Sequence, residues 1–385
     1  MLTRLSEATR TDSGGKAAML GALLREGLPV PDGFVIPTGG TPTGAEIGRS
    51  RRDAVARELG RLGDPVVAVR SSATNEDTED ASAAGQYESI LGVRGIDDVC
   101  QAIMACRESA SAARVGDYWR RTGGASRAPD MAVLVQPVVE SEVSGVLFTP
   151  QQTGEPTRIE ASWGLGLAVV GGTVTPDTYE IAPDGTVGCS VGTKQTRIDL
   201  NHEHGGIATS TATPDQQHAR ALNDDTVAVL ADMGGRIARA LGGPQDVEWV
   251  VAGGVVWILQ ARPITAALPA STVPGSFGPA EGLRGTPGSH GTVTAAVRVV
   301  RGPSDFGAVR RGDIVVCPYT GPAWTPLFTV ASGVVTETGG ALSHAAIVAR
   351  EYGIPAVLGV TDATTRVDNG ALIAVDGTAG TVIIL

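Results

Sequence analysis

Cysteine is scarce in this sequence, and its spacing excludes two classes of protein. The 385 residues contain four cysteines, which are Cys100, Cys106, Cys189 and Cys317. They are scattered without a CxxC pair, so we expect reduced thiols rather than a disulfide framework or a zinc site. The His202-x-His204 pair does not change this expectation, because no convincing third and fourth ligands lie near it in the sequence.

Long apolar runs and a surplus of positive charge are also missing. No apolar stretch approaches the roughly 18 residues that a membrane helix requires, and the N-terminus has no apolar signal core. The net charge of -11 argues against a polyanionic partner, because nucleic-acid-binding proteins need a basic face. The length and the 42% hydrophobic content predict two or three globular domains. We therefore expect a cytoplasmic protein that binds neither nucleic acid nor a membrane.

Residues 333–355 contain the segment that best indicates a function. They predict a short strand, a glycine turn and a helix that begins near Ser343 and ends at Gly353 and Pro355. His344 then lies in the first turn, where free amides and the helix dipole favour an anion. A neutral imidazole is a nucleophile near pH 7, and its phosphorylated form suits such a place. For an isolated histidine, the alternative is a residue that only caps or packs on the helix.

This stretch closely resembles the phosphohistidine motif of the family that comprises phosphoenolpyruvate synthase, pyruvate phosphate dikinase and rifampicin phosphotransferase. The matching segments are 338–340, 343–351 and 353–357. The resemblance implies that His344 is the phosphorylated residue. It also implies that 284–385 form a β/β/α swivelling phosphohistidine domain, with short strands at 292–300, 313–317, 333–336, 371–375 and 381–385.

Two basic residues near the N-terminus are candidate ligands for a phosphate. Lys16 is expected at the start of a helix, where the dipole disfavours a cation unless an anion binds there. A solvated lysine is the alternative. A buried strand at 65–69 leads into Arg70 and the small residues 71–73, which predict a phosphate cradle followed by an acidic, flexible run at 74–80.

A hairpin near residue 253 carries a polar trio. Two strands, 246–251 and 255–264, flank a Gly-Gly turn, so pairing can bring Glu248 across from Gln260 and Arg262. A carboxylate and an amide oxygen suit Mg²⁺, and a guanidinium can neutralise a transferred phosphoryl group. Without further information, such a trio is more often a salt-bridged surface.

The family resemblance extends over nearly the whole chain and implies a nucleotide site. It implies an α+β multidomain protein: an ATP-grasp nucleotide-binding domain at 1–265 with lobes at about 1–125 and 126–265, a linker at 266–283, and the phosphohistidine domain at 284–385. Glu248 and Gln260 would hold Mg²⁺. The residues implied to contact ATP are Lys16, Arg70, Ala84, Gly85, Gln86, Gln136, Val138, Glu248, Gln260 and Arg262. In one departure, Ala83 stands where the family has an aromatic residue.

Several further elements are predicted around these sites. We expect helices at 53–62 and 96–121, a strand at 131–139, and a helix from about Asp215 to Leu241 that breaks near Gly234. Glu160 leads into a glycine turn. Lys194 lies in a strand-like run, where a contact with phosphate is the alternative to the solvated lysine that we expect.

By resemblance, the chain is an ATP-dependent phosphotransferase of the dikinase type. It would form phosphohistidine at His344, release AMP and phosphate, and pass the phosphoryl group to a small-molecule acceptor that the sequence does not identify. One alternative is a subunit of a split synthase or ligase whose partner chain supplies the acceptor site. Another is a phosphocarrier or nucleotide-binding regulatory module without catalytic turnover.

Overall fold

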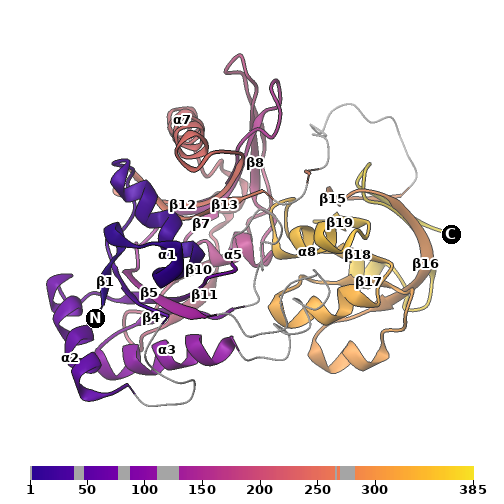
Figure 1. Ribbon diagram of the computed structural model, residues 1–385. Helices are drawn as coiled ribbons and strands as arrows, with labels where there is room; N and C mark the ends of the chain where they lie inside the picture. The colour runs from indigo at the N-terminus through magenta and orange to yellow at the C-terminus, as the bar shows by residue number, and fades with distance from the viewer. Residues whose placement is uncertain (1, 39–46, 77–86, 111–129, 265–266, 269–281) are drawn as a thin grey trace. The chain divides into compact units, whose positions relative to one another are not determined.

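A computed structural model describes residues 2–38, 47–76, 87–110, 130–264, 267–268 and 282–385 (Figure 1). The chain divides into two compact units. Unit 1 comprises Met1–Thr149, Ile198–Ser210 and Ala228–Ile264, and unit 2 comprises Pro150–Arg197, Thr211–Val227 and Thr265–Leu385. The α+β multidomain fold expected from the sequence is confirmed. The predicted domain boundaries stay a prediction, and most of the predicted linker lies outside the described residues.

Unit 1 contains a five-stranded antiparallel sheet. Its strands, in spatial order, are β1 (Thr3–Arg4), β2 (Phe34–Ile36), β5 (Met131–Pro137), β3 (Val67–Ala73) and β4 (Ser89–Val93). Val67 and Val69 of β3, two residues apart, join one buried cluster with side chains of the helices α2 (Arg49–Arg61) and α3 (Ile96–Ser109). Period-two alternation therefore directs one face of the sheet toward these helices. The unit also contains η1 (Leu5–Glu7) and α1 (Arg10–Arg25).

Two elements of this region have other bounds than those predicted. Helix α2 begins at Arg49, four residues before the predicted start, because no helix breaker occurs after Gly48. Strand β3 does not stop before Arg70 but continues to Ala73, pairing with β5 along its whole length. The small residues expected to form a phosphate cradle are therefore part of a buried strand.

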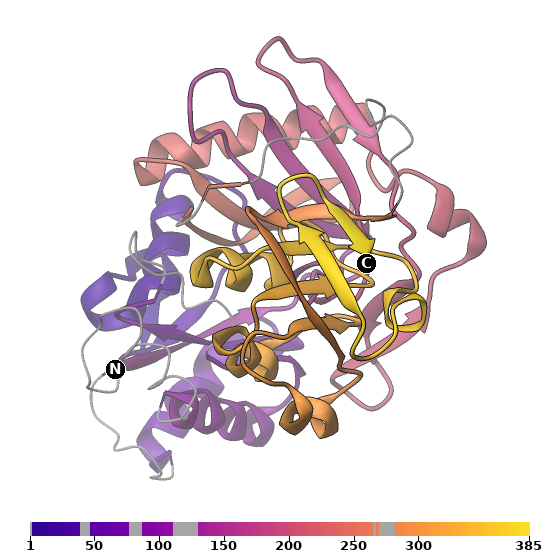
Figure 2. The same ribbon diagram turned by 90° about the vertical axis from the view of Figure 1, so that its right-hand side faces the viewer.

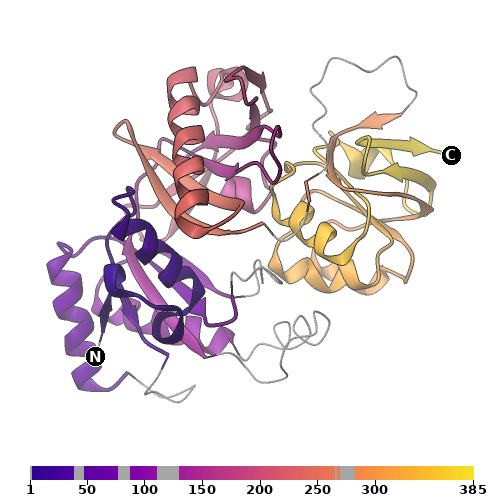
Figure 3. The ribbon, with the colours of Figure 1, turned by 45° about the horizontal axis from the view of Figure 1, so that its top comes forward.

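Unit 1 also contains strands β13 (Val255–Pro263), β12 (Gln245–Ala252) and β6 (Val143–Phe148), in that order. Helix α7 (Asp224–Leu241) lies against β6 (Figure 3). The predicted break near Gly234 was wrong, because α7 continues through it. A Cβ at Gly234 would lie 2.7 Å from Leu147, so this glycine allows close packing rather than a bend. The helical segment is interrupted earlier, between α6 (Pro214–His218) and α7.

Unit 2 contains an antiparallel set of strands, β7 (Thr157–Trp163), β8 (Asp177–Ile181) and β9 (Val187–Ser190), and the short helix α5 (Leu167–Val170). Strands β10 (Thr196–Leu200) and β11 (Ile207–Thr211), most of whose residues belong to unit 1, form a separate pair.

The larger sheet of unit 2 has eight strands. Its centre is parallel, from β16 (Thr292–Val299) through β17 (Ile314–Cys317) and β18 (Gly333–Thr336) to β19 (Ala356–Leu358). Strands β20 (Leu372–Asp376) and β21 (Thr381–Ile384) form the terminal antiparallel hairpin (Figure 2). Helical segments η2 (Pro303–Ala308), η3 (Pro322–Thr329), α8 (His344–Tyr352) and α9 (Ala363–Arg366) connect the strands. In spatial order the strands are β14 (Leu283–Arg284), β21 (Thr381–Ile384), β20 (Leu372–Asp376), β16 (Thr292–Val299), β17 (Ile314–Cys317), β18 (Gly333–Thr336), β19 (Ala356–Leu358) and β15 (Thr286–Ser289).

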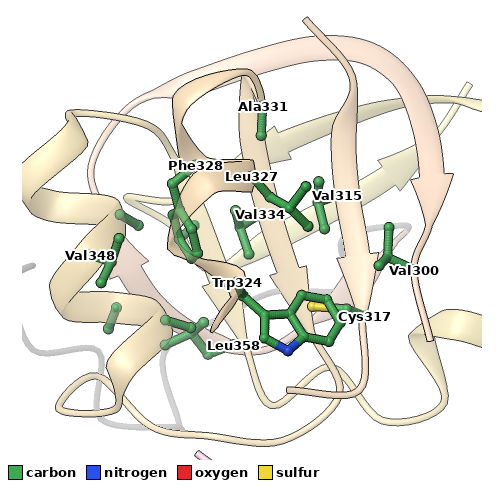
Figure 4. Close-up of a cluster of buried hydrophobic side chains, with 14 residues drawn as sticks. Val300, Val315, Cys317, Trp324, Leu327, Phe328, Ala331, Val334, Val348 and Leu358 are labelled. Atoms are coloured by element: carbon green, nitrogen blue, oxygen red, sulfur yellow. The ribbon is translucent and has the colours of Figure 1, made fainter. Parts of the chain in front are cut away.

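The core of unit 2 lies on both faces of this sheet. Val315 and Cys317 of β17 join the cluster that packs against α8 and η3, which Figure 4 shows with Trp324, Phe328 and Val348. Ile314 and Val316 join a second cluster. Burial of both faces explains why β17 is a continuous apolar run. The apolar side of α8 is thus fixed against the parallel strands.

Candidate active site

His344 is the first residue of α8, as the sequence predicts. Ser343 precedes the helix with extended backbone angles, and its hydroxyl donates to the Gly340 carbonyl at 2.8 Å. The helix ends at Gly353, whose φ of +64° is the left-handed conformation that glycine tolerates best. The predicted start and end of this helix are both confirmed.

The imidazole of His344 is enclosed within unit 2. The residue is 5% exposed, and its Nδ1 lies 3.0 Å from the Thr320 hydroxyl oxygen. The Phe328 ring meets it edge to face, with 6.3 Å between centroids. A contact at Nδ1 fixes the orientation of the ring and determines which nitrogen carries the proton. Sequence reasoning missed Thr320, which lies in a loop 24 residues away and belongs to no motif.

Glu160 of β7 contacts the loop that leads to His344. Its carboxylate accepts a hydrogen bond from the Leu342 amide at 3.2 Å. Burial raises the pKa of the Glu160 carboxyl to about 7, although the amides of Leu342 and Ala341 and the charges of Arg350 and Arg158 act to lower it. The sequence indicated only that Glu160 precedes a glycine turn.

In unit 1, the structure brings together three of the predicted nucleotide-site residues. Glu248 and Gln260 face each other in the register of the β12–β13 hairpin, as predicted. The Arg70 guanidinium donates to the Gln260 amide oxygen at 2.7 Å, lies 3.5 Å from the Glu248 carboxylate, and donates to the Leu259 carbonyl at 2.5 Å. A carboxylate, an amide oxygen and a guanidinium therefore form one polar cluster.

Arg262 lies two residues beyond Gln260 on β13. Its guanidinium forms a buried ion pair with Asp246, at 2.7 and 2.8 Å from one carboxylate oxygen. Asp246 is its register partner on β12. In this structure, the charge of Arg262 is thus balanced by a carboxylate.

Lys16 also has a partner that the sequence did not reveal. Helix α1 has a non-helical residue at Gly14, with φ +77°, so Lys16 starts the second helical stretch as predicted. Its ammonium lies 2.7 Å from the Glu76 carboxylate and 3.2 Å from the Ser71 carbonyl, and it is buried. The solvated-lysine alternative is therefore excluded, and Glu76 is a paired residue rather than part of a flexible run.

The remaining predicted contacts with ATP are placed differently. Gln136 is buried in β5 and its side-chain amide donates to the Pro31 carbonyl at 2.8 Å, while the Val138 amide donates to the Val66 carbonyl. Their roles toward adenine stay a prediction. Three more, Ala84, Gly85 and Gln86, lie outside the described residues, as does Ala83.

Lys194 corrects another expectation. It is fully buried and forms an ion pair with the equally buried Asp177 in unit 2. Its ammonium also donates to the Gly192 carbonyl at 3.0 Å. Lys194 is therefore a structural cation of unit 2 and not a solvated lysine.

The donor set of the Arg70 cluster fits a hard cation. Glu248 and Gln260 supply two oxygen ligands on paired strands, and Mg²⁺ prefers oxygen ligands completed by water and phosphate. Among the described residues, no group of three or more histidine, cysteine or acidic side chains could hold a metal. A metal held by Glu248 and Gln260 would therefore need further ligands, which water and phosphate oxygens can supply.

Comparison with known proteins identifies the family. Residues 45–274 match the AMP/ATP-binding domain of pyruvate phosphate dikinase, and residues 309–380 match the mobile domain of PEP-utilising enzymes. The chain belongs to the pyruvate phosphate dikinase AMP/ATP-binding family. The resemblance drawn from the sequence is confirmed. ATP and Mg²⁺ are the cofactors of this family, as that resemblance implied.

Relatives of the chain are named phosphoenolpyruvate synthases. The probable enzymes of Methanothermobacter thermautotrophicus and Archaeoglobus fulgidus are each 35% identical to 96% of the chain, and that of Pyrococcus furiosus is 38% identical to 82% of it. The chain spans only 61%, 56% and 40% of these three proteins, respectively. In the described part of the chain, no helix combines the length and hydropathy needed to cross a bilayer.

Proposed function

We propose that this chain is an ATP-dependent phosphotransferase of the dikinase type, with His344 as the phosphorylated residue. The observation that carries the proposal is the position of the His344 ring, which opens helix α8 with its Nδ1 held by Thr320. When Nδ1 donates its proton to the Thr320 oxygen, the lone pair of Nε2 becomes the nucleophile. The free amides of the first helical turn then stabilise the negative charge of the product.

The proposed reaction has two steps. The Nε2 lone pair attacks the β-phosphorus of ATP, and the bond from that phosphorus to the α,β-bridging oxygen breaks, so that AMP leaves with the electron pair. Water then removes the terminal phosphate and leaves phosphohistidine. The chain thereby stores one phosphoryl group from ATP on a residue of unit 2.

The polar cluster of unit 1 would bind the triphosphate. Arg70, Arg262 and Lys16 supply positive charge for its oxygens. Mg²⁺, held by Glu248 and Gln260, would supply further charge neutralisation when bound. Because each of the three cations has an acceptor partner in the structure, we expect phosphate oxygens to replace part of those contacts.

The acceptor is proposed from the relatives. Because they are named phosphoenolpyruvate synthases, pyruvate is the first small-molecule acceptor to test. A separate subunit that binds the acceptor is the alternative arrangement. We also propose a cytoplasmic location, which the four free cysteines support.

The proposal is tested with ATP labelled at a single phosphorus. Label at the β position should appear on the wild-type chain in acid-labile form, whereas label at the γ position should leave as phosphate. His344→Ala should abolish the β-labelling, and His290→Ala, which changes an exposed histidine, should not. Equal β-labelling in wild type and His344→Ala would refute the role of His344.

Formation of AMP separates the proposal from a regulatory or carrier module. A phosphotransferase forms AMP when ATP and a competent acceptor are present. A module that only holds nucleotide would bind ATP and form no AMP under any acceptor, with or without a partner chain. Mass spectrometry of the nucleotide pool after addition of pyruvate measures this difference directly.

A further inference from the structure

A second set of contacts in unit 2 concerns the loop of residues 338–343, hereafter the histidine loop. Glu160 lies in the segment that matches the AMP/ATP-binding domain, whereas the histidine loop lies in the segment that matches the mobile domain. The hydrogen bond from the Leu342 amide to Glu160 joins residues 182 positions apart. A residue of the nucleotide-binding segment thus contacts the backbone immediately before His344.

Two backbone carbonyls near Glu160 extend this contact. The Thr338 hydroxyl donates to the Gly172 carbonyl at 2.6 Å, and the Gly339 amide donates to the Val174 carbonyl at 3.0 Å. Both acceptors lie between α5 and β8. The histidine loop is therefore held at three of its residues by one short stretch of chain.

The fit at Gly340 shows how close this contact is. A Cβ added to Gly340 would lie 2.3 and 2.4 Å from the two carboxylate oxygens of Glu160, which real Cβ atoms do not approach so closely. Gly340 is therefore required for the carboxylate to occupy its place. The loop sequence and Glu160 are sterically complementary.

The loop is also held from within its own segment. The Arg350 guanidinium donates to the Ala341 carbonyl at 2.8 Å, and this carbonyl belongs to the same peptide group as the Leu342 amide that Glu160 accepts from. Arg350 of α8 and Arg158 of β7 are the charged groups that act on Glu160. Glu160 and Arg350 together define the backbone of residues 341 and 342.

We propose that Glu160, with the carbonyls of Gly172 and Val174, forms a docking clasp for the histidine loop, and that Glu160 is a positioning residue for His344. The proposal rests on the proposed function for the purpose of the clasp, but the contacts themselves can be tested without it. Burying a carboxylate costs desolvation free energy, whereas an apolar side chain would fill the same space without that cost. Packing alone therefore does not explain a glutamate at this position. One of its oxygens instead accepts the hydrogen bond of the Leu342 amide, which would otherwise lack an acceptor in this buried loop.

The first experiment measures loop order and phosphorylation in the same variants. Hydrogen exchange of the peptide that covers Ala341 and Leu342 should rise at least about tenfold in Glu160→Ala, because the buried Leu342 amide loses its acceptor. Labelling of His344 by β-labelled ATP should slow by a similar factor, while ATP affinity stays within about twofold of wild type. Glu160→Gln keeps one acceptor oxygen, so its exchange and labelling rates should lie between those of wild type and Glu160→Ala. Glu203→Gln, the same change at an exposed glutamate, is the matched control.

A compensating pair tests the steric fit. Gly340→Ala should loosen the histidine loop, because its new methyl displaces the carboxylate. Combining it with Glu160→Ala removes the clash, so the double variant should be no worse than Glu160→Ala alone. Additive losses in the double variant would show that the two residues do not share one contact and would overturn the clasp.

The pH dependence of loop protection from hydrogen exchange shows whether the Glu160 carboxyl contributes to docking. The Glu160 pKa is raised in the docked loop relative to an exposed glutamate, so docking binds a proton and weakens as the pH rises through about 7. Loop protection, corrected for intrinsic exchange, should therefore fall across that range in wild type. In Glu160→Gln it should be independent of pH.

The outcomes separate the two proposals. The clasp would be overturned if the rates of loop exchange and of His344 labelling stayed within about twofold of wild type in both Glu160→Ala and Glu160→Gln. Absence of any label on wild-type His344 would instead refute the proposed function, and the exchange and pH measurements would still decide whether the clasp exists.

Discussion

Replacing Thr320 by valine tests the part of the site that controls the chemistry of His344. The substitution keeps the shape of the side chain and removes only the hydroxyl, which lies 3.0 Å from Nδ1 in a buried environment. Losing one partner of a buried hydrogen bond costs about 1–3 kcal/mol. At about 1.4 kcal/mol for each factor of ten, this corresponds to a roughly 5- to 150-fold loss of the correctly oriented ring and tautomer.

The expected result is a slower first turnover, by roughly that factor, with unchanged affinity for ATP. The assay is the single-turnover labelling of His344 with β-labelled ATP, combined with ¹⁵N NMR of the histidine ring to identify the tautomer. Thr365→Val is the matched control, because Thr365 is exposed and its hydroxyl donates to the nearby Asp362 carbonyl at 2.9 Å. Wild-type labelling and an unchanged NMR spectrum in Thr320→Val would refute the argument that this hydroxyl sets the tautomer.

Three further changes have defined outcomes. Lys194→Met leaves the buried Asp177 carboxylate without its cation and should lower the free energy of unfolding by about 3–5 kcal/mol, measured by urea denaturation; recovery in Lys194→Met/Asp177→Asn is the control. Gly353→Ala places a Cβ at φ +64° and should cost about 1–2 kcal/mol in the same assay, and no loss would contradict the left-handed C-terminus. Glu248→Gln should weaken binding of Mg²⁺–ATP about tenfold in calorimetry but leave metal-free ATP binding unchanged, and equal loss in both would contradict its role toward the metal.

Local sequence patterns were sufficient for the elements that carry the candidate residues. Helix α8 was predicted correctly because its start and its stop at Gly353 lie within a few residues of His344. The β12–β13 hairpin was predicted for the same reason, since its Gly-Gly turn fixes the register that pairs Glu248 with Gln260. The sequence therefore predicts the placement of a candidate residue when that placement is fixed by residues close to it along the chain.

The partners of these residues could not be predicted in the same way. Thr320 lies in a loop without a motif, and Glu76 lies in an acidic run that resembles a solvated segment. Glu160 reaches the histidine loop across 182 positions of sequence. No local property of these residues distinguishes a side chain with a buried partner from one in solvent. Lys194 was misjudged for this reason, because only the fold brings Asp177 beside it.

The pairing of the basic residues bears on how a nucleotide would bind. Leaving a buried cation without a partner costs several kcal/mol, and in this fold Glu76 and Asp246 balance the charges of Lys16 and Arg262. Under the proposed function, the triphosphate therefore exchanges partners with these carboxylates instead of filling an empty positive site. The net gain in binding free energy at each cation is then the difference between its interaction with a phosphate oxygen and its interaction with the carboxylate that the phosphate replaces. Affinity should accordingly depend most on Arg70, because its guanidinium donates to neutral amide and carbonyl oxygens and stands 3.5 Å from the Glu248 carboxylate.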